Sequence, residues 1–203
     1  MTRAAIIGFL AALASASAWA HVGVHVDGAF GTGFVHPFLG LDHLLAMVAV
    51  GIWAVQIGGR CLVALPVAFV TFMAVGAALG AIGVPLPQVE GMIALSVLAL
   101  GCAVGSSENM GSGSNFGPAR KQKWSLTPIF LVAAFALFHG HAHGTEMPEF
   151  SLPWQYFAGF ALATVALHAL GVAAASALKK HPALVRAGGA AIGVAGSWLV
   201  ISL

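Results

Sequence analysis

Apolar runs separated by short polar joints fill the chain from about residue 34 onwards. Each run approaches the roughly 20 residues that an α-helix needs to cross the hydrocarbon core of a membrane. The joints contain Gly, Pro, Ser or paired Lys, and such residues favour turns and loops. The pattern predicts an all-α integral membrane protein in which residues 21–203 form one domain, a bundle of six transmembrane helices. The expected helices cover residues 34–56, 62–84, 89–106, 127–146, 154–178 and 187–203.

Residues 1–20 have the layout of a secretory signal peptide, with a positively charged start, a short apolar stretch and Ala-Trp-Ala at positions 18–20. We expect cleavage after this tripeptide, which leaves His21 as the first residue, outside the cytoplasm. The alternative is an uncleaved helix over residues 4–20, which is only just long enough to span a bilayer.

The composition supports a membrane protein and excludes other classes. Only 7% of the residues are charged and 60% are hydrophobic, with a mean hydropathy of +0.97. A soluble domain carries about 25% charged residues, so this chain cannot cover a water-exposed surface. Its partner is therefore the lipid bilayer. The net charge of +2 provides no basic surface for nucleic acid.

Glycine is frequent, with 26 in the chain. Small residues let helix backbones approach closely inside a membrane, where burial of apolar surface gives little drive for association. We therefore expect Gly76, Gly80, Gly101 and Gly105 to lie at contacts between helices.

The basic residues predict which ends of the helices face the cytoplasm. If the chain starts outside, every second joint lies on the inner side of the membrane. All seven Lys and Arg residues after the signal peptide fall in these joints, which is the positive-inside pattern. They are Arg60, Arg120, Lys121, Lys123, Lys179, Lys180 and Arg186.

The first expected helix carries a cluster of ionisable residues, which are costly in lipid and are usually functional there. His36 and His43 lie seven residues apart, about two helical turns, and so share one face of a continuous helix. Asp42 can either bind a metal ion itself or hold a neighbouring imidazole in the tautomer that binds metal.

The fourth expected helix carries a second cluster at similar depth, in the outer half of the membrane. His139, His143 and Glu146 follow the i, i+4, i+7 spacing that places them on one face. His141 points roughly the opposite way on an ideal helix. Imidazoles and carboxylates on facing helices suit Ni²⁺, Co²⁺, Zn²⁺ or Cu²⁺ rather than Mg²⁺ or Ca²⁺.

The remaining ionisable residues lie outside the two clusters. His168 lies alone in an apolar run. It is either a hydrogen-bond partner between helices or a deeper metal ligand. Glu90 begins the third expected helix on the outer side. The segment with His21, His25 and Asp27 is either a solvated terminus or a weak outer capture site for metal.

The two clusters resemble the signatures of the HupE/UreJ family of nickel/cobalt transporters. The first resemblance runs over His-Pro-x-x-Gly-x-Asp-His at residues 36–43 and over residues 45–54, and the second over Phe-His-Gly-x-Ala-His-Gly-x-Glu at residues 138–146. Two further pairs are similar to family patterns: Glu90 with Ser96, and Thr164 with His168.

This resemblance extends over essentially the whole chain. It implies a secondary metal permease associated with nickel enzymes such as hydrogenase or urease, or with cobalt use in cobalamin synthesis. It also implies functional roles for Glu90 and His168. With the signal peptide, it leads us to expect a multi-pass protein of the bacterial inner membrane.

Three classes of function can be compared with these residues. An importer of nickel or cobalt needs ligands inside the membrane and no cofactor, and the sequence contains no Gly-x-x-x-x-Gly-Lys-Ser/Thr loop for ATP. An intramembrane metalloenzyme is disfavoured because Gly140 stands where a His-Glu-x-x-His motif has Glu. A haem-binding electron carrier needs only two histidines per haem and leaves Asp42 and Glu146 unexplained.

The predicted topology can be tested with reporter fusions. Fusions at Gly113 and Lys180 are expected to report the cytoplasm, and a fusion at Leu203 the periplasm, because the basic joints remain inside. A cytoplasmic C-terminus in a chain whose signal peptide has been removed would contradict this topology.

Overall fold

The structure, a computed structural model, describes residues 28–107, 126–147 and 152–203. All regular elements in these three segments are α-helices, which confirms the all-α fold class. The helices are α2 (Ala29–Leu39), α3 (Leu41–Ile57), α4 (Cys61–Ala81), α5 (Val89–Ser106), α6 (Thr127–Thr145), α7 (Pro153–Ala177) and α8 (Pro182–Ile201). The expected signal peptide over residues 1–20 lies outside the described residues.

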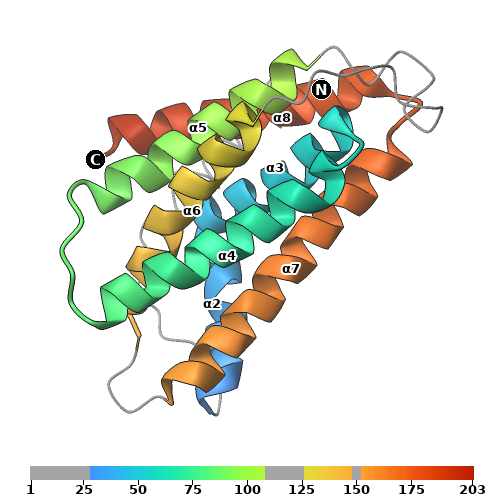
Figure 1. The fold of residues 1–203 in the computed structure, drawn as a ribbon. Helices are drawn as coiled ribbons and strands as arrows, with labels where there is room; N and C mark the ends of the chain where they lie inside the picture. The colour runs from blue at the N-terminus through green and yellow to red at the C-terminus, as the bar shows by residue number, and fades with distance from the viewer. Residues whose placement is uncertain (1–27, 108–125, 148–151) are drawn as a thin grey trace.

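The helices lie alongside one another in an elongated bundle, with α2 packed at the end where α7 begins (Figure 1). The most extensive contacts pair α4 with α6, α5 with α8, and α7 with both α2 and α3. Helix α3 is central, because it also contacts α4, α5 and α8. Its residues Ala46, Met47 and Val50 are completely buried and form part of the hydrophobic core.

The first expected helix, predicted as one continuous span over residues 34–56, is broken. Helices α2 and α3 meet at an angle of 82°. Gly40, between them, has an extended backbone. Pro37, in the last turn of α2, has no backbone N–H group to donate to the helix. A Cβ atom at Gly40 would lie 2.7 Å from the Asp42 Oδ1 atom and 3.1 Å from the His43 Nδ1 atom. The expectation that His36 and His43 share a face of one helix is therefore wrong.

Glycines hold α4 and α6 together, as expected for Gly76 and Gly80. A Cβ atom at Gly76 would collide with the backbone of Leu137, and one at Gly80 with that of His141. The two helices therefore touch backbone to backbone and run parallel. Gly101 and Gly105 likewise lie at a close backbone contact, between α5 and α8, and these two helices run antiparallel.

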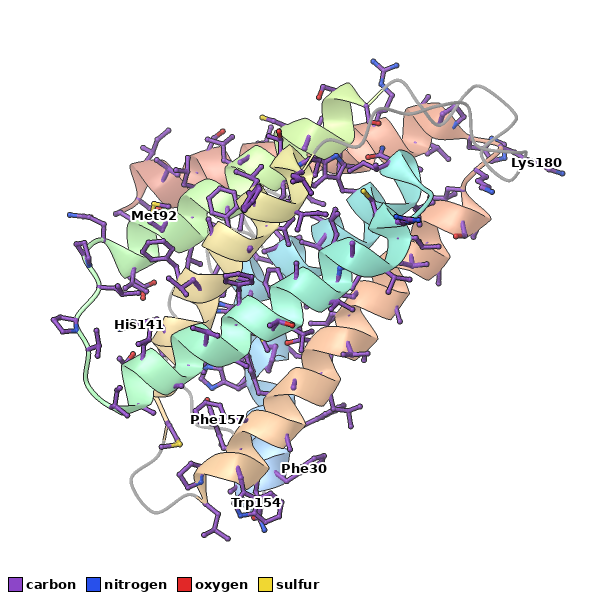
Figure 2. All side chains as sticks on the ribbon, in the orientation of Figure 1. Phe30, Met92, His141, Trp154, Phe157 and Lys180 are labelled. Atoms are coloured by element: carbon purple, nitrogen blue, oxygen red, sulfur yellow. The ribbon has the colours of Figure 1, made fainter. Side chains whose placement is uncertain are left out.

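The two ends of the bundle differ in the residues that they carry. Lys180, in the connection from α7 to α8, lies at the opposite end from Met92 near the start of α5 and His141 near the end of α6 (Figure 2). This arrangement fits the expected alternation, in which the basic joints share one side.

Within the described residues, four helices are long and apolar enough to cross a membrane, namely α4, α5, α7 and α8. The bent pair of α2 and α3 makes a fifth span if it is counted as one. Helix α6 is not among them, because histidines and Gly occupy its last two turns. A multi-pass membrane protein is supported, while the count of six spans stays a prediction.

The contact between α4 and α6 leads to a prediction for Gly76→Leu. The new side chain would collide with the α6 backbone at Leu137, and overpacking of this kind destabilises proteins by about 1–3 kcal/mol or more. We expect a lower melting temperature of the purified protein or loss of folded protein from the membrane.

Gly188→Leu is the matched control, because nothing lies within 4 Å of a Cβ atom at that position on α8. Its melting temperature should equal that of the wild type. Equal stability of both variants would contradict the close packing of α4 on α6.

Candidate metal site

Four histidine rings from three helices form a continuous row. His36 on α2 and His43 on α3 both contact His143 on α6, with ring centroids 4.7 and 4.3 Å apart respectively. The ring of His43 also lies 4.8 Å from that of His139, one turn earlier on α6. The structure thus brings together the two clusters that the sequence predicted, with His143 at the point where they meet.

The exposed end of this row is a pair of charged or chargeable groups. The His36 Nε2 atom lies 3.1 Å from the Glu146 Oε2 atom, and the side chains are 31% and 51% exposed respectively. His36, His143 and Glu146 each offer a ligand atom, and these atoms lie within 4.8 Å of one another. Two imidazoles and one carboxylate can hold a divalent transition metal while water completes its coordination.

Two helix ends point at this exposed trio. The last turn of α2 contains His36, and the last turn of α6 contains His143. The C-terminal end of a helix carries a partial negative charge, which favours a nearby cation. The backbone therefore adds to the attraction that Glu146 exerts on a metal ion.

Asp42 holds the imidazole of His43 in one orientation. Its Oδ1 atom accepts the backbone N–H of His43 at 2.7 Å and lies 2.8 Å from the His43 Nδ1 atom. A carboxylate can only accept here, so Nδ1 carries the proton and Nε2 keeps its lone pair. Of the two roles that the sequence left open for Asp42, this geometry supports the second, the orienting one.

Ser96 on α5 does the same for His139. The Ser96 hydroxyl donates its hydrogen to the Ile93 carbonyl oxygen at 2.6 Å, so the Nε2–H group of His139 must donate to the Ser96 Oγ atom at 2.8 Å. The Nδ1 atom of His139 therefore keeps its lone pair. Both neighbours thus leave one imidazole nitrogen ready to bind a metal.

The nitrogens that remain are buried and have no hydrogen-bond partner within the described residues. They are the His43 Nε2, the His139 Nδ1 and both ring nitrogens of His143. Leaving a buried polar atom unsatisfied costs about 1–3 kcal/mol. Several such atoms side by side indicate a site built for a ligand rather than for packing.

His168 lies deeper, on α7, and is also buried with both ring nitrogens unpartnered among the described residues. Phe69 on α4 separates it from the row, with its ring centroid 5.6 Å from that of His139 and 5.1 Å from that of His168. His168 also lines an apolar cavity of about 550 Å³ between α4 and α7. The structure thus places His168 beyond the buried end of the row without direct contact.

The remaining predicted residues lie elsewhere. Glu90 is exposed in the first turn of α5 and is not part of the exposed trio. The predicted capture residues, His21, His25 and Asp27, lie outside the described residues.

His141 faces away from the row, as its helical position predicted. Its Nε2 atom lies 2.7 Å from the carbonyl oxygen of Val84, beside the connection from α4 to α5 (Figure 2). This hydrogen bond gives His141 a structural role.

Sequence reasoning missed the aromatic residues around the site. Phe160 packs on His143 with ring centroids 3.8 Å apart, and Tyr156 lies next to His36. Together with Phe69 they enclose the histidines. Aromatic residues inside apolar runs give no sequence signal that separates the wall of a site from ordinary core.

Comparison with known proteins gives an independent result. The sequence model of the family described as HupE / UreJ protein matches residues 9–199. The protein named Protein HupE from Rhizobium leguminosarum bv. viciae is 45% identical over 197 residues, which cover 95% of both chains. No solved structure matches the chain.

Such a match is specific, because it covers nearly the whole chain. Proteins of this family are transporters or accessory proteins linked to the maturation of nickel enzymes, and membership supports a role in nickel or cobalt transport in general. The expected absence of enzymatic activity agrees with this. The chain belongs to the HupE / UreJ family.

Proposed function

We propose that this protein is a secondary transporter that imports Ni²⁺, with Co²⁺ as the other candidate substrate, through the row of histidines and carboxylates. The observation that carries the proposal is the row itself. The row begins at the exposed pair of His36 and Glu146 and continues to buried imidazoles. Neighbouring rings have centroids 4.3 to 4.8 Å apart, and the buried rings carry nitrogens without a partner among the described residues.

In this proposal the ion first binds at the exposed end. His36, His143 and Glu146 replace part of its water shell there, since their ligand atoms already lie close together. A divalent ion cannot enter a low-dielectric interior without compensating charge. Glu146 and Asp42 supply two negative charges, one at each side of His143.

The ion then passes along the row by ligand exchange. His143 contacts both His36 and His43, so it can remain bound while the exposed ligands leave and His43 joins. A transport site must bind firmly enough to dehydrate the ion and weakly enough to release it. An open row of sites satisfies this better than one closed cage. His139 and then His168 carry the ion inwards.

The ligand types set the selectivity. Neutral imidazoles favour late first-row transition metals and exclude Mg²⁺ and Ca²⁺, which prefer oxygen ligands. Nickel and cobalt are neighbours in the affinity series and take the same ligands, so both remain substrates in this proposal.

The wider context of transport is also proposed. A mature chain starting at His21 would present His21, His25 and Asp27 to the periplasm for loose capture of the ion. No bound cofactor is needed in this scheme. Import across the inner membrane would supply the maturation of hydrogenase or urease.

The alternative of a haem-binding electron carrier or an intramembrane enzyme is not favoured. Family membership points to transporters or accessory proteins. Neighbouring imidazole rings also contact each other edge to face, which leaves room for a small ion between them but not for a macrocycle.

The proposal predicts the behaviour of two variants, Asp42→Asn and His43→Ala. The first keeps the volume of the side chain and a hydrogen-bond acceptor but loses the charge, and the second removes a ligand. Uptake of radiolabelled nickel by cells expressing either variant should fall by about 10- to 100-fold, because a charge or ligand at the ion path is lost.

His141→Ala and His181→Ala are the matched controls, since His141 faces away from the row and His181 caps the start of α8. Their uptake should stay close to that of the wild type at equal expression. Normal nickel uptake by Asp42→Asn and His43→Ala would contradict the proposed path.

A further inference from the structure

Tyr156, the sole tyrosine of the chain, has a feature that the transport path does not use. It lies in the first turn of α7 and is completely buried, yet its hydroxyl group has no hydrogen-bond partner among the described residues. Buried tyrosines usually find a partner for this group, and an unsatisfied hydroxyl is costly. The hydroxyl hydrogen is therefore available to a partner outside the described protein atoms.

The position of Tyr156 identifies that partner. Its ring lies 6.2 Å from the ring of His36, at an angle of 73°. The His36 side chain in turn contacts Glu146, with its Nε2 atom 3.1 Å from the Glu146 Oε2 atom. The phenol therefore stands next to the exposed trio of His36, His143 and Glu146.

The surrounding backbone fixes this placement. The main chain of Tyr156 lies directly against Gly33, where a Cβ atom would collide with it. Gly159, one turn further along α7, makes the same kind of contact with Phe30. The backbone of Tyr156 cannot move away from α2 unless α2 separates from α7.

Metal binding changes the hydrogen bonding of Glu146. Without metal, the Glu146 Oε2 atom is paired with the His36 Nε2 atom at 3.1 Å. A metal ion bound by the lone pair of the same nitrogen requires the tautomer with the proton on Nδ1, so this hydrogen bond is lost. One carboxylate oxygen then binds the metal, and the other is free to accept a hydrogen bond.

We propose that Tyr156 is a positioning residue of the exposed metal site, whose hydroxyl donates a hydrogen bond to Glu146 when a divalent metal ion is bound there. The inference rests on the transport function proposed above. The phenol orients the carboxylate through its second oxygen and stays protonated, since a neutral donor suits a ligating carboxylate. Tyr156 touches Glu146 rather than the metal.

The first experiment measures nickel binding to purified protein by calorimetry. Tyr156→Phe keeps the ring and removes only the hydroxyl, and the dissociation constant for Ni²⁺ should rise about tenfold, as for other residues that orient a metal ligand. Ser197→Ala is the matched control, because it removes a hydroxyl that bonds to Gly193 within α8, a helix that contributes nothing to the row. Its dissociation constant should equal that of the wild type.

The second experiment observes the hydroxyl directly. Because Tyr156 is the sole tyrosine, ring-labelled tyrosine gives infrared bands from this residue alone. Adding nickel to the wild type should shift the frequency of the phenol C–O band to the value of a phenol that donates a hydrogen bond. A merely structural role in packing would leave the band unchanged.

The outcomes separate this inference from the function on which it rests. Tyr156 has no positioning role if His36→Ala loses nickel binding while Tyr156→Phe binds within about twofold of the wild type, where an orienting residue costs tenfold or more. An unchanged phenol band in nickel-saturated wild type would also exclude the positioning role. If the wild type binds no nickel, or if His36→Ala binds it normally, the transport site itself is wrong and the inference fails with it.

Discussion

The bend of 82° at Gly40 is the constraint on which the site depends. On a straight helix, His36 and His43 would lie about 10 Å apart along the axis, because each residue advances the helix by about 1.5 Å. With the bend, both rings reach His143, at 4.7 and 4.3 Å. The break therefore makes two separate histidines parts of one row.

A broken helix in a membrane protein needs protection for its free backbone groups, which is available where the break is buried in protein or lines a cavity. Here α7 packs against both α2 and α3, and the last turn of α6 lies against the end of α2. The break also leaves the negative end of α2 facing the exposed trio. Discontinuous helices whose ends face an ion are a recurring device of secondary transporters, and this fold contains the same elements.

The sequence predicted the helical class, the close glycine contacts and the two clusters of ionisable residues, because each depends on local pattern. It did not predict the break, since residues 34–56 read as one apolar run and the Pro37 and Gly40 signals are compatible with a kinked continuous helix. The spacing of His36 and His43 places them on one face of a straight helix, which is wrong, although their rings do converge. Tertiary packing decides whether two such rings converge, and the spacing of residues along the chain carries no information about it.

Other features were beyond reach for the same physical reason. The hydrogen bond from His139 to Ser96 selects the tautomer of His139, and it joins residues 43 positions apart. Phe160 and Tyr156 enclose the site from α7, and their rings look like core in the sequence. Helix α6, with its C-cap, carries His139, His143 and Glu146, and the polar residues of its last two turns make it too polar to pass as a span by composition.

X-ray absorption at the nickel edge can reveal whether the buried imidazoles bind the ion. Nickel bound to the purified protein should show nitrogen and oxygen ligands with the multiple-scattering signal of more than one imidazole. His143→Ala should reduce that signal, because His143 joins the two halves of the row. A shell of oxygen ligands alone, or an imidazole signal unchanged by His143→Ala, would contradict the account.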